Sequence, residues 1–175
     1  MPTIILLPDG AGATDSGWVT SSGATNECLD DDNGDTSYVA CSTHNDEMIV
    51  TYANPSFDEA TLESITSVQF LSSGRSTNRR SASMVNISFE SPTAGFSENC
   101  SYNASLSYET INGTPRVYSN PSISVDWTYA NLNNLEMKCK KFLGAQVRLS
   151  YLALLVTYVL KDVVETDSIF FGANF

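Results

Sequence analysis

The stretch VRLSYLALLVTYVL, residues 147–160, is nearly continuous in apolar and aromatic side chains. It is too short to cross a bilayer as a helix, which takes about 20 apolar residues. A short apolar run of this kind, rich in β-branched and aromatic residues, is typical of a strand that is buried on both faces. The segment therefore predicts a buried strand and no membrane span.

Residues 83–91, SMVNISFES, have a different pattern, in which polar and apolar side chains alternate. Val85, Ile87 and Phe89 make up the apolar side. A period of two is that of a strand with one face turned to the core. The sequence predicts a half-buried strand here.

Residues 64–75, SITSVQFLSSGR, also alternate, with Ile65 expected on the opposite face from Val68 and Phe70. The turn sequences NGTP and SNPS punctuate the following segments at near-regular intervals. Short strands separated by such turns are typical of an antiparallel sandwich rather than of an α/β sheet. The predicted fold class is therefore all-β, an antiparallel β-sandwich.

One segment interrupts the strands, and we expect a single short helix over about 128–142. Thr128 is a suitable N-cap, and Gly144 follows the expected end. Apolar residues spaced by three and by four along a helix lie on one face. The positions expected to face the core are Leu132, Leu135 and Cys139.

The charge balance argues against a nucleic-acid partner. Lysine and arginine number 9 against 20 aspartates and glutamates, so the net charge is −11. Such a chain repels phosphate backbones. At 175 residues the chain fits a single domain. We expect an N-terminal arm or edge strand at 1–10, a sandwich domain at 11–160 and a C-terminal tail or arm at 161–175.

The N-terminal segment MPTIILLPDGAG has no basic residue ahead of its apolar run, so we do not expect a secretory signal. We therefore expect the protein to be made in the cytosol, where thiols stay reduced. The cysteines concerned are Cys28, Cys41, Cys100 and Cys139.

The aspartate loop, CLDDDNGDTSYVAC at residues 28–41, is the weak candidate for a calcium site, through Asp30, Asp32 and Asp35. Counted from Asp30, an EF-hand loop needs glycine at the sixth position and glutamate at the twelfth. The chain has Asp35 and Cys41 there. The Asn-Gly pair instead indicates a tight turn, so a solvated turn is the favoured interpretation.

Catalytic motifs are missing from the sequence. The single histidine, His44, lies close to Cys41 and Ser42, but residues that near along one strand point to alternating faces. Neither a phosphate-binding glycine loop nor a nucleophile elbow occurs. We expect no catalytic residues, no cofactor and no enzymatic activity. A sandwich glycosidase with carboxylates from distant strands stays open.

The order of segments resembles a family of small virion structural proteins of tailed bacteriophages. Members carry a tryptophan followed by text like LDD…DTDYV, and end with W…DLN.LE before a strand like VRVSYLYLEVTYV. The matching residues in the first half are Trp18, Leu29, Asp30, Asp35, Thr36, Tyr38 and Val39. Those in the second half are Trp127, Leu132, Asn133, Leu135, Glu136, Val147, Arg148, Ser150, Tyr151, Val156, Thr157 and Tyr158. The resemblance covers about 18–160, and the tail after Val159 departs from it.

The resemblance implies a jelly-roll-like β-sandwich with a place on the virion, assembled in the bacterial cytoplasm. The expected function is a capsid decoration, or cement, protein that bridges capsid subunits. Expected partners are the major capsid protein or other virion proteins, and a homo-oligomer, with a trimer favoured. The alternative is a neck, collar or tail-fibre component that binds a receptor or carbohydrate.

Two sets of residues follow as candidates for contact. Apolar terminal segments suit arms that join a neighbouring subunit, or in the N-terminal case an edge strand of the same sandwich. The interface candidates are Ile4, Ile5, Leu6, Leu7, Ile169, Phe170, Phe171 and Phe175. For carbohydrate binding the aromatic candidates are Trp18, Tyr52, Tyr102, Tyr108, Tyr118 and Tyr129, with core packing as the alternative for each.

Overall fold

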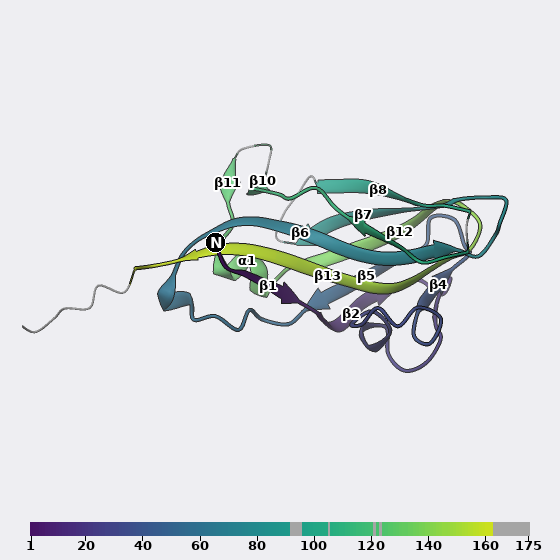
Figure 1. Cartoon of the computed structure of the whole chain (residues 1–175), viewed down its shortest axis with the longest axis horizontal. Coiled ribbons are helices and arrows are strands. Elements are labelled where there is room, and N and C mark those ends of the chain that lie inside the picture. The colour runs from purple at the N-terminus through teal and green to yellow at the C-terminus, as the bar shows by residue number, and fades with distance from the viewer. Residues whose placement is uncertain (92–95, 105, 121, 123, 163–175) are drawn as a thin grey trace, which may run out of the picture.

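The chain folds as an antiparallel β-sandwich with one short α-helix, which confirms the predicted fold class (Figure 1). The computed structural model describes all residues except 92–95, 105, 121, 123 and 163–175. Within the described residues, no helix has the length and apolar character needed to span a membrane.

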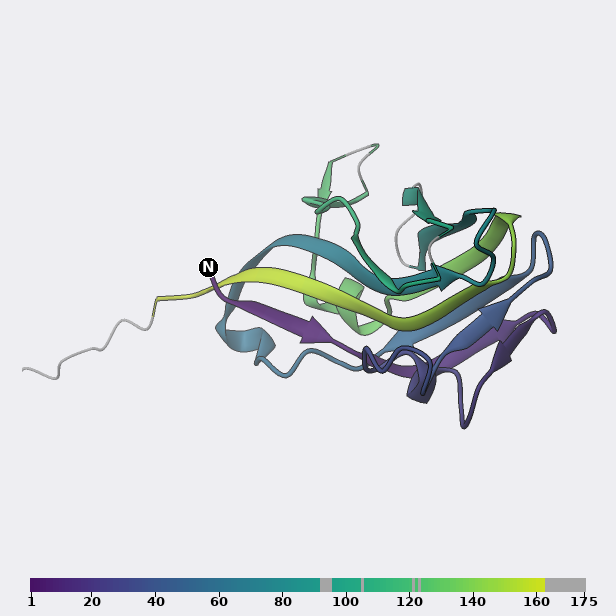
Figure 2. The ribbon, with the colours of Figure 1, turned by 45° about the vertical axis from the view of Figure 1, so that its right-hand side comes forward.

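The first layer, sheet A, is built around two long strands, β13 (Val147–Leu160) and β6 (Leu62–Ser76). Both views show these strands side by side along the length of the molecule (Figures 1 and 2). Their free edges are extended by four shorter strands: β4 (Val39–Cys41), β3 (Trp18–Thr20), β1 (Thr3–Leu6) and β9 (Glu109–Asn112). β4 and β1 lie one after the other along β13, and β3 lies outside β4, whereas β9 pairs with β6.

The second layer, sheet B, has the order β2-β5-β12-β7-β8. Its strands are β2 (Pro8–Thr14), β5 (Glu47–Tyr52), β12 (Glu136–Gly144), β7 (Ser83–Ser91) and β8 (Phe96–Tyr102). A small ribbon of β10 (Tyr118–Asn120) and β11 (Val125–Asp126) stands apart from both sheets in the two views. The helical elements are α1 (Tyr129–Asn133) and two 3-10 turns, η1 (Asn26–Cys28) and η2 (Glu59–Thr61).

The two strands that the sequence defines best have the predicted bounds. β13 begins and ends at the limits of the quoted apolar run, and Leu149, Leu152 and Leu154 are fully buried between the sheets. Ala153, on the opposite side of the strand, is buried as well. The prediction of a strand buried on both faces is therefore confirmed for its middle section.

β7 shows the half-buried pattern that its alternation predicts. Val85, Ile87 and Phe89 are buried in the core, whereas Met84 and Asn86 are partly exposed on the outer face. Alternation in the sequence translates directly into burial because this strand pairs without interruption with β8.

The prediction for β6 is wrong at Ile65. Ile65 is buried together with Val68 and Phe70, not on the opposite face. The register between β6 and β13 shifts between Thr157 and Tyr158, so that one residue of β6 is skipped. A bulge of this kind adds a residue to one strand and reverses its alternation.

The predicted helix at about 128–142 is also wrong in its extent. α1 covers only Tyr129–Asn133, and residues 136–144 form β12 in the middle of sheet B. The predicted cap is confirmed: Thr128 Oγ1 accepts a hydrogen bond from the Asn131 backbone, and Asn131 Oδ1 accepts one from the Thr128 backbone. Pairing on both sides, with β5 and β7, overrides the helix-forming residues that follow.

The buried side chains of residues 136–144 follow the alternation of a strand, β12, and not the spacing of a helix. Met137, Cys139 and Lys141 point into the sandwich and are buried, whereas Lys138 and Lys140 alternate with them on the outer face. Lys141 Nζ donates to the backbone oxygens of Leu143 and Gly144, so the ammonium is hydrogen-bonded at the end of the strand. Burial lowers the pKa of Lys141 below its usual value.

Candidate functional site

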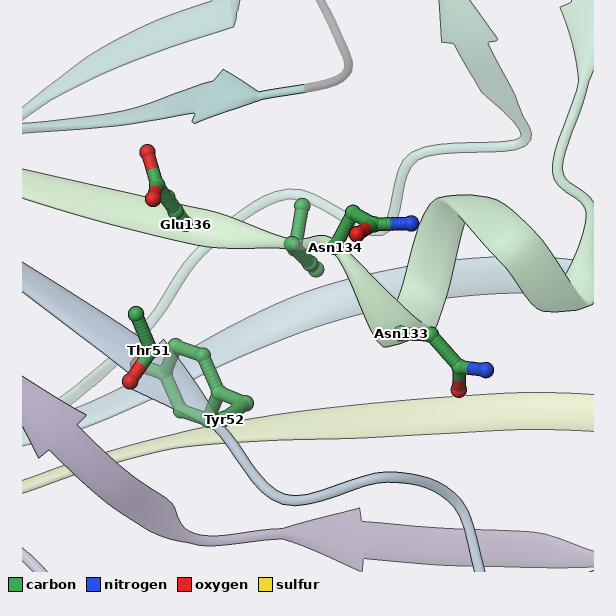
Figure 3. A pocket seen from close by; sticks show the side chains of 6 residues that line it. Thr51, Tyr52, Asn133, Asn134 and Glu136 are labelled. Carbon is green, nitrogen blue, oxygen red and sulfur yellow. The ribbon is translucent and has the colours of Figure 1, made fainter.

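A pocket of about 270 Å³ lies at one end of sheet B, where β5 ends, α1 ends and β12 begins. Figure 3 shows this site from close by. The lining residues are Thr51, Tyr52, Asn133, Asn134, Leu135 and Glu136.

The local sequence builds the pocket from a helix that stops early. α1 ends at Asn133, and β12 starts three residues later at Glu136. Leu135 is buried in the junction, as is Tyr52 at the end of β5. These two side chains give the pocket an apolar base, and the polar lining comes from the strands and the helix end.

Thr51 and Glu136 are direct cross-strand neighbours on β5 and β12. Figure 3 shows Thr51 and Glu136 on neighbouring strands, whereas the amide group of Asn134, at the helix end, points away from both. Asn134 is exposed, and its amide Nδ2 donates a hydrogen bond to the Ala130 backbone oxygen at 2.8 Å. Its Oδ1 makes no hydrogen bond with a described residue.

Two further polar groups lie at the pocket, one hydrogen-bonded and one without a partner among the described residues. The Thr51 hydroxyl donates to Asp9 Oδ1 at 3.0 Å, which places a second carboxylate next to the lining. Asn133 Oδ1 is buried and has no hydrogen-bond partner among the described residues. A buried acceptor without a partner costs free energy.

On the outer face of sheet B, one carboxylate next to β12 is paired with lysines and another, on β12 itself, is not. Lys140 Nζ lies 2.9 Å from Glu47 Oε1, and Lys138 Nζ lies 3.6 Å from Glu47 Oε2. The hydrogen bond from Lys140 holds the pKa of Glu47 below its usual value against the effect of burial. Glu136, in contrast, makes no ion pair with any described residue.

The aspartate loop forms a second polar cluster, on the outer face of sheet A. Arg75 of β6 and Arg148 of β13 are cross-strand neighbours, and both contact Asp35 Oδ1, at 2.5 and 2.8 Å. Their guanidinium groups also lie over tyrosine rings: Arg148 is 4.2 Å from the centroid of Tyr38, and Arg75 is 5.4 Å from that of Tyr108.

Other contacts fix the same loop to sheet A. The Ser150 hydroxyl donates to Asp32 Oδ1 at 3.1 Å, and the Leu29 backbone oxygen accepts from the Leu152 amide at 3.0 Å. The predicted Asn-Gly turn is present, with Gly34 at a φ of +61°. No three His, Cys, Asp or Glu side chains within the described part of the chain are grouped so as to hold a metal ion.

Half of the six aromatic candidates lie in the core. Trp18, Tyr52 and Tyr102 are buried, and Tyr102 donates through its hydroxyl to Ser72 Oγ at 2.9 Å. Tyr108 and Tyr129 are half-buried, and Tyr118 is exposed. Tyr52 is the candidate that the structure brings to the pocket, where it forms part of the base.

The N-terminal interface candidates lie on and next to β1. Leu6 is buried and Ile4 packs against the core, while Ile5 and Leu7 are exposed. β1 pairs with β13 of its own sheet, with Thr3 opposite Thr157. The C-terminal candidates Ile169, Phe170, Phe171 and Phe175 lie outside the described residues.

The residues near the single histidine do not form a reactive group. The His44 ring packs against Phe142, with 6.0 Å between ring centroids. The Cys41 thiol is buried and donates to the Thr43 backbone oxygen. Burial raises the pKa of Cys41 to about 11, so the thiolate nucleophile is scarce at neutral pH.

Sequence reasoning missed most of the pocket. Thr51 and Asn134 belong to no motif, Asn133 and Glu136 match only the virion-protein motif, and the segment around the last three lining residues was expected to be helical. The available signal was the pair Asn133-Asn134, since asparagine is a weak helix former and is common where helices end.

No protein-family model matches this sequence, and no curated protein matches it significantly. Solved structures of carbohydrate-binding modules do match the fold. One is the C-terminal CBM6 of LamC, a marine laminarinase from Zobellia galactanivorans: TM-score 0.50, 8% identity, covering 89% of this chain and 100% of that one. Another is the CBM36-1 domain of a xylanase from the hindgut metagenome of Trinervitermes trinervoides: TM-score 0.47, 15% identity, 90% and 98% coverage. At these identities the likeness concerns the fold alone, which is jelly-roll-like as expected.

Proposed function

We propose that this chain is a non-catalytic module that binds carbohydrate through the pocket between α1, β5 and β12. The observation that carries the proposal is the lining itself, in which hydroxyl, amide and carboxylate groups surround an apolar base. Sugars present the same combination, hydroxyl groups around a ring with apolar C–H faces. Sites of this make-up fix a ligand by a few placed polar groups.

The size of the pocket restricts the ligand. About 270 Å³ lies below the roughly 300–1,000 Å³ of sites that enclose a drug-sized molecule. The pocket therefore accommodates one sugar unit, with the remainder of a longer chain outside. The jelly-roll-like fold shared with carbohydrate-binding modules supports this function.

Isothermal titration calorimetry with short glucan, xylan and glucosamine-based oligosaccharides tests the proposal. We expect Thr51→Val and Asn134→Ala each to weaken binding about threefold to tenfold, the loss of one net hydrogen bond. Asn99→Ala is the matched control, because Asn99 is an exposed asparagine of sheet B on β8, away from the pocket lining. Unchanged affinity in both pocket variants would remove the pocket from the proposal.

A second candidate function is the decoration of a virion, proposed from the sequence resemblance. Ile5 and Leu7, which are 49% and 40% exposed, would supply an apolar contact with a neighbouring subunit. Ile5→Ser together with Leu7→Ser should then abolish incorporation into particles without unfolding the domain. The count of this chain per particle, from quantitative mass spectrometry, separates a shell-wide position from one at the neck or tail.

A further inference from the structure

We propose that the sugar unit recognised by the pocket carries a protonated amino group, as the glucosamine units of a deacetylated chitin chain do. This inference rests on the proposed carbohydrate-binding function and names the class of ligand. It follows from the balance of charges and hydrogen-bonding groups around the pocket.

The pocket offers more acceptors than donors. Glu136 contributes a carboxylate, and the Thr51 hydroxyl already donates its proton to Asp9, whose carboxylate adds a second negative charge beside the lining. Asn134 donates one of the two N–H groups of its amide to the Ala130 backbone oxygen and keeps the other N–H group and Oδ1.

The lysines that lie nearest to Glu136 along β12 contact a different carboxylate, that of Glu47. Lys138 and Lys140 follow Glu136 on the same face of β12, and both reach Glu47. Glu47 lies opposite Lys140, whereas Glu136 lies opposite Thr51 at the other end of the paired segment. Both lysines contact Glu47, and the Glu136 carboxylate makes no ion pair with a cation among the described residues.

An ammonium group supplies hydrogen-bond donors, in which the lining of the pocket is poor, and the positive charge that the lining lacks. It has three donors and no acceptor, and its charge matches the carboxylates of Glu136 and Asp9. A neutral sugar supplies only uncharged hydroxyl or amide donors, and an acidic sugar would add repulsion. The net charge of −11 draws a cationic chain toward the molecule from a distance.

Three oligosaccharides with the same β-1,4 backbone isolate the amino group. They are glucosamine, N-acetylglucosamine and glucose oligomers of equal length, titrated into the protein by calorimetry. At about pH 5.5 amines are protonated and ordinary carboxyl groups are ionised. We expect the glucosamine oligomer to bind at least about fivefold more tightly than the other two, the strength of one partly exposed ion pair. We also expect this preference to shrink at about 0.5 M salt.

Glu136→Gln is the decisive variant, because glutamine keeps the shape and removes the charge. It should abolish the preference for the glucosamine oligomer over the glucose oligomer. Glu63→Gln is the control, since Glu63 is an exposed carboxylate on sheet A that is not part of the pocket lining. A preference that survives Glu136→Gln would overturn the proposal.

The same titrations separate the two levels of the proposal. Equal binding of all three oligomers would overturn the amino-sugar inference and leave carbohydrate binding in place. Binding of none of these, nor of the neutral glucans and xylans, would overturn both. A lysine-rich peptide that binds as tightly as the glucosamine oligomer would show that the site takes ammonium groups in general, which also overturns the assignment to a sugar.

Discussion

Asp35 and Glu136 are both partly exposed carboxylates on the outer faces of the sandwich, yet their surroundings are opposite. Asp35 accepts from Arg75 and Arg148 on sheet A. Glu136 makes no ion pair with a described residue and borders a pocket on sheet B. The difference indicates that Asp35 belongs to the fold, holding the aspartate loop on the sheet, whereas Glu136 is available to a ligand.

The same contrast holds for four lysine and arginine side chains, which contact carboxylates outside the pocket. Arg75 and Arg148 both contact Asp35 of the aspartate loop, and Lys138 and Lys140 both contact Glu47. These four cations contact carboxylates outside the pocket lining, so the carboxylate of Glu136 at the pocket makes no ion pair with a described residue. Substitutions on the two sides should therefore separate into effects on stability and effects on binding.

The largest effect is expected at the base of the aspartate loop. Leu29→Ala removes a fully buried side chain and should lower the free energy of unfolding by about 2–5 kcal/mol, through lost burial and the cavity left behind. Urea denaturation measures this change. Leu160→Ala, at an exposed leucine, is the control and should cost far less. A loss below about 1 kcal/mol at Leu29 would mean that the loop refills the space.

A smaller loss is expected for the Asp35 pairs. Asp35→Asn should lower the free energy of unfolding by about 1 kcal/mol, since the carboxylate is 60% exposed and solvent screens the ion pairs. A double-mutant cycle with Arg148→Met isolates the pair. Zero coupling energy in that cycle would contradict a role of Asp35 in the fold. Ligand affinity at the pocket should not change.

The Asp35 contribution should also depend on pH in one direction. Burial raises the pKa of Asp35, but the hydrogen bonds from Arg148 and Arg75 outweigh it, so the pKa lies below the usual 3.8. A lowered pKa in the folded state stabilises the protein above about pH 4, and this stabilisation is lost as the pH falls through the folded value. The stability difference from Asp35→Asn should therefore shrink as the pH falls below about 4. A difference that stays constant over this range would be inconsistent with the ion pairs.

The smallest effect on stability is expected at Glu136. Glu136→Gln should change the free energy of unfolding by no more than about 0.5 kcal/mol, because no internal partner is lost. Thermal or urea unfolding measures it beside the binding titrations. A loss comparable to that of Asp35→Asn would show that Glu136, too, supports the fold.

The sequence predicts strands best where burial alternates without interruption. β7 and β13 have the expected bounds, because their side-chain pattern and their pairing agree. Ile65 was misplaced because a bulge depends on how two distant strands are aligned, which no local pattern contains. The segment 136–144 was misread because lysine, leucine and methionine favour helices, and only the strands on both sides make it a strand.

The pocket was harder to predict than the fold. Its walls combine residues near position 51 with residues near position 135, and their meeting depends on the pairing of β5 with β12. The aspartate loop was recognised as unusual, and its turn was found. Its partners Arg75 and Arg148 lie 40 and 113 residues further along the chain, beyond the reach of any motif.

The pairing of β1 with β13 determines how the domain would respond to a pulling force. Thr3 lies opposite Thr157, and the Tyr158 amide donates to the Pro2 backbone oxygen, so the two strand ends leave the sheet together (Figure 1). Tension applied between residues 2 and 161 would open this antiparallel pair one hydrogen bond at a time instead of shearing it. β1 would therefore detach first and at low force, while sheet B and its pocket stay intact, and single-molecule force spectroscopy would record this as an early, small extension step.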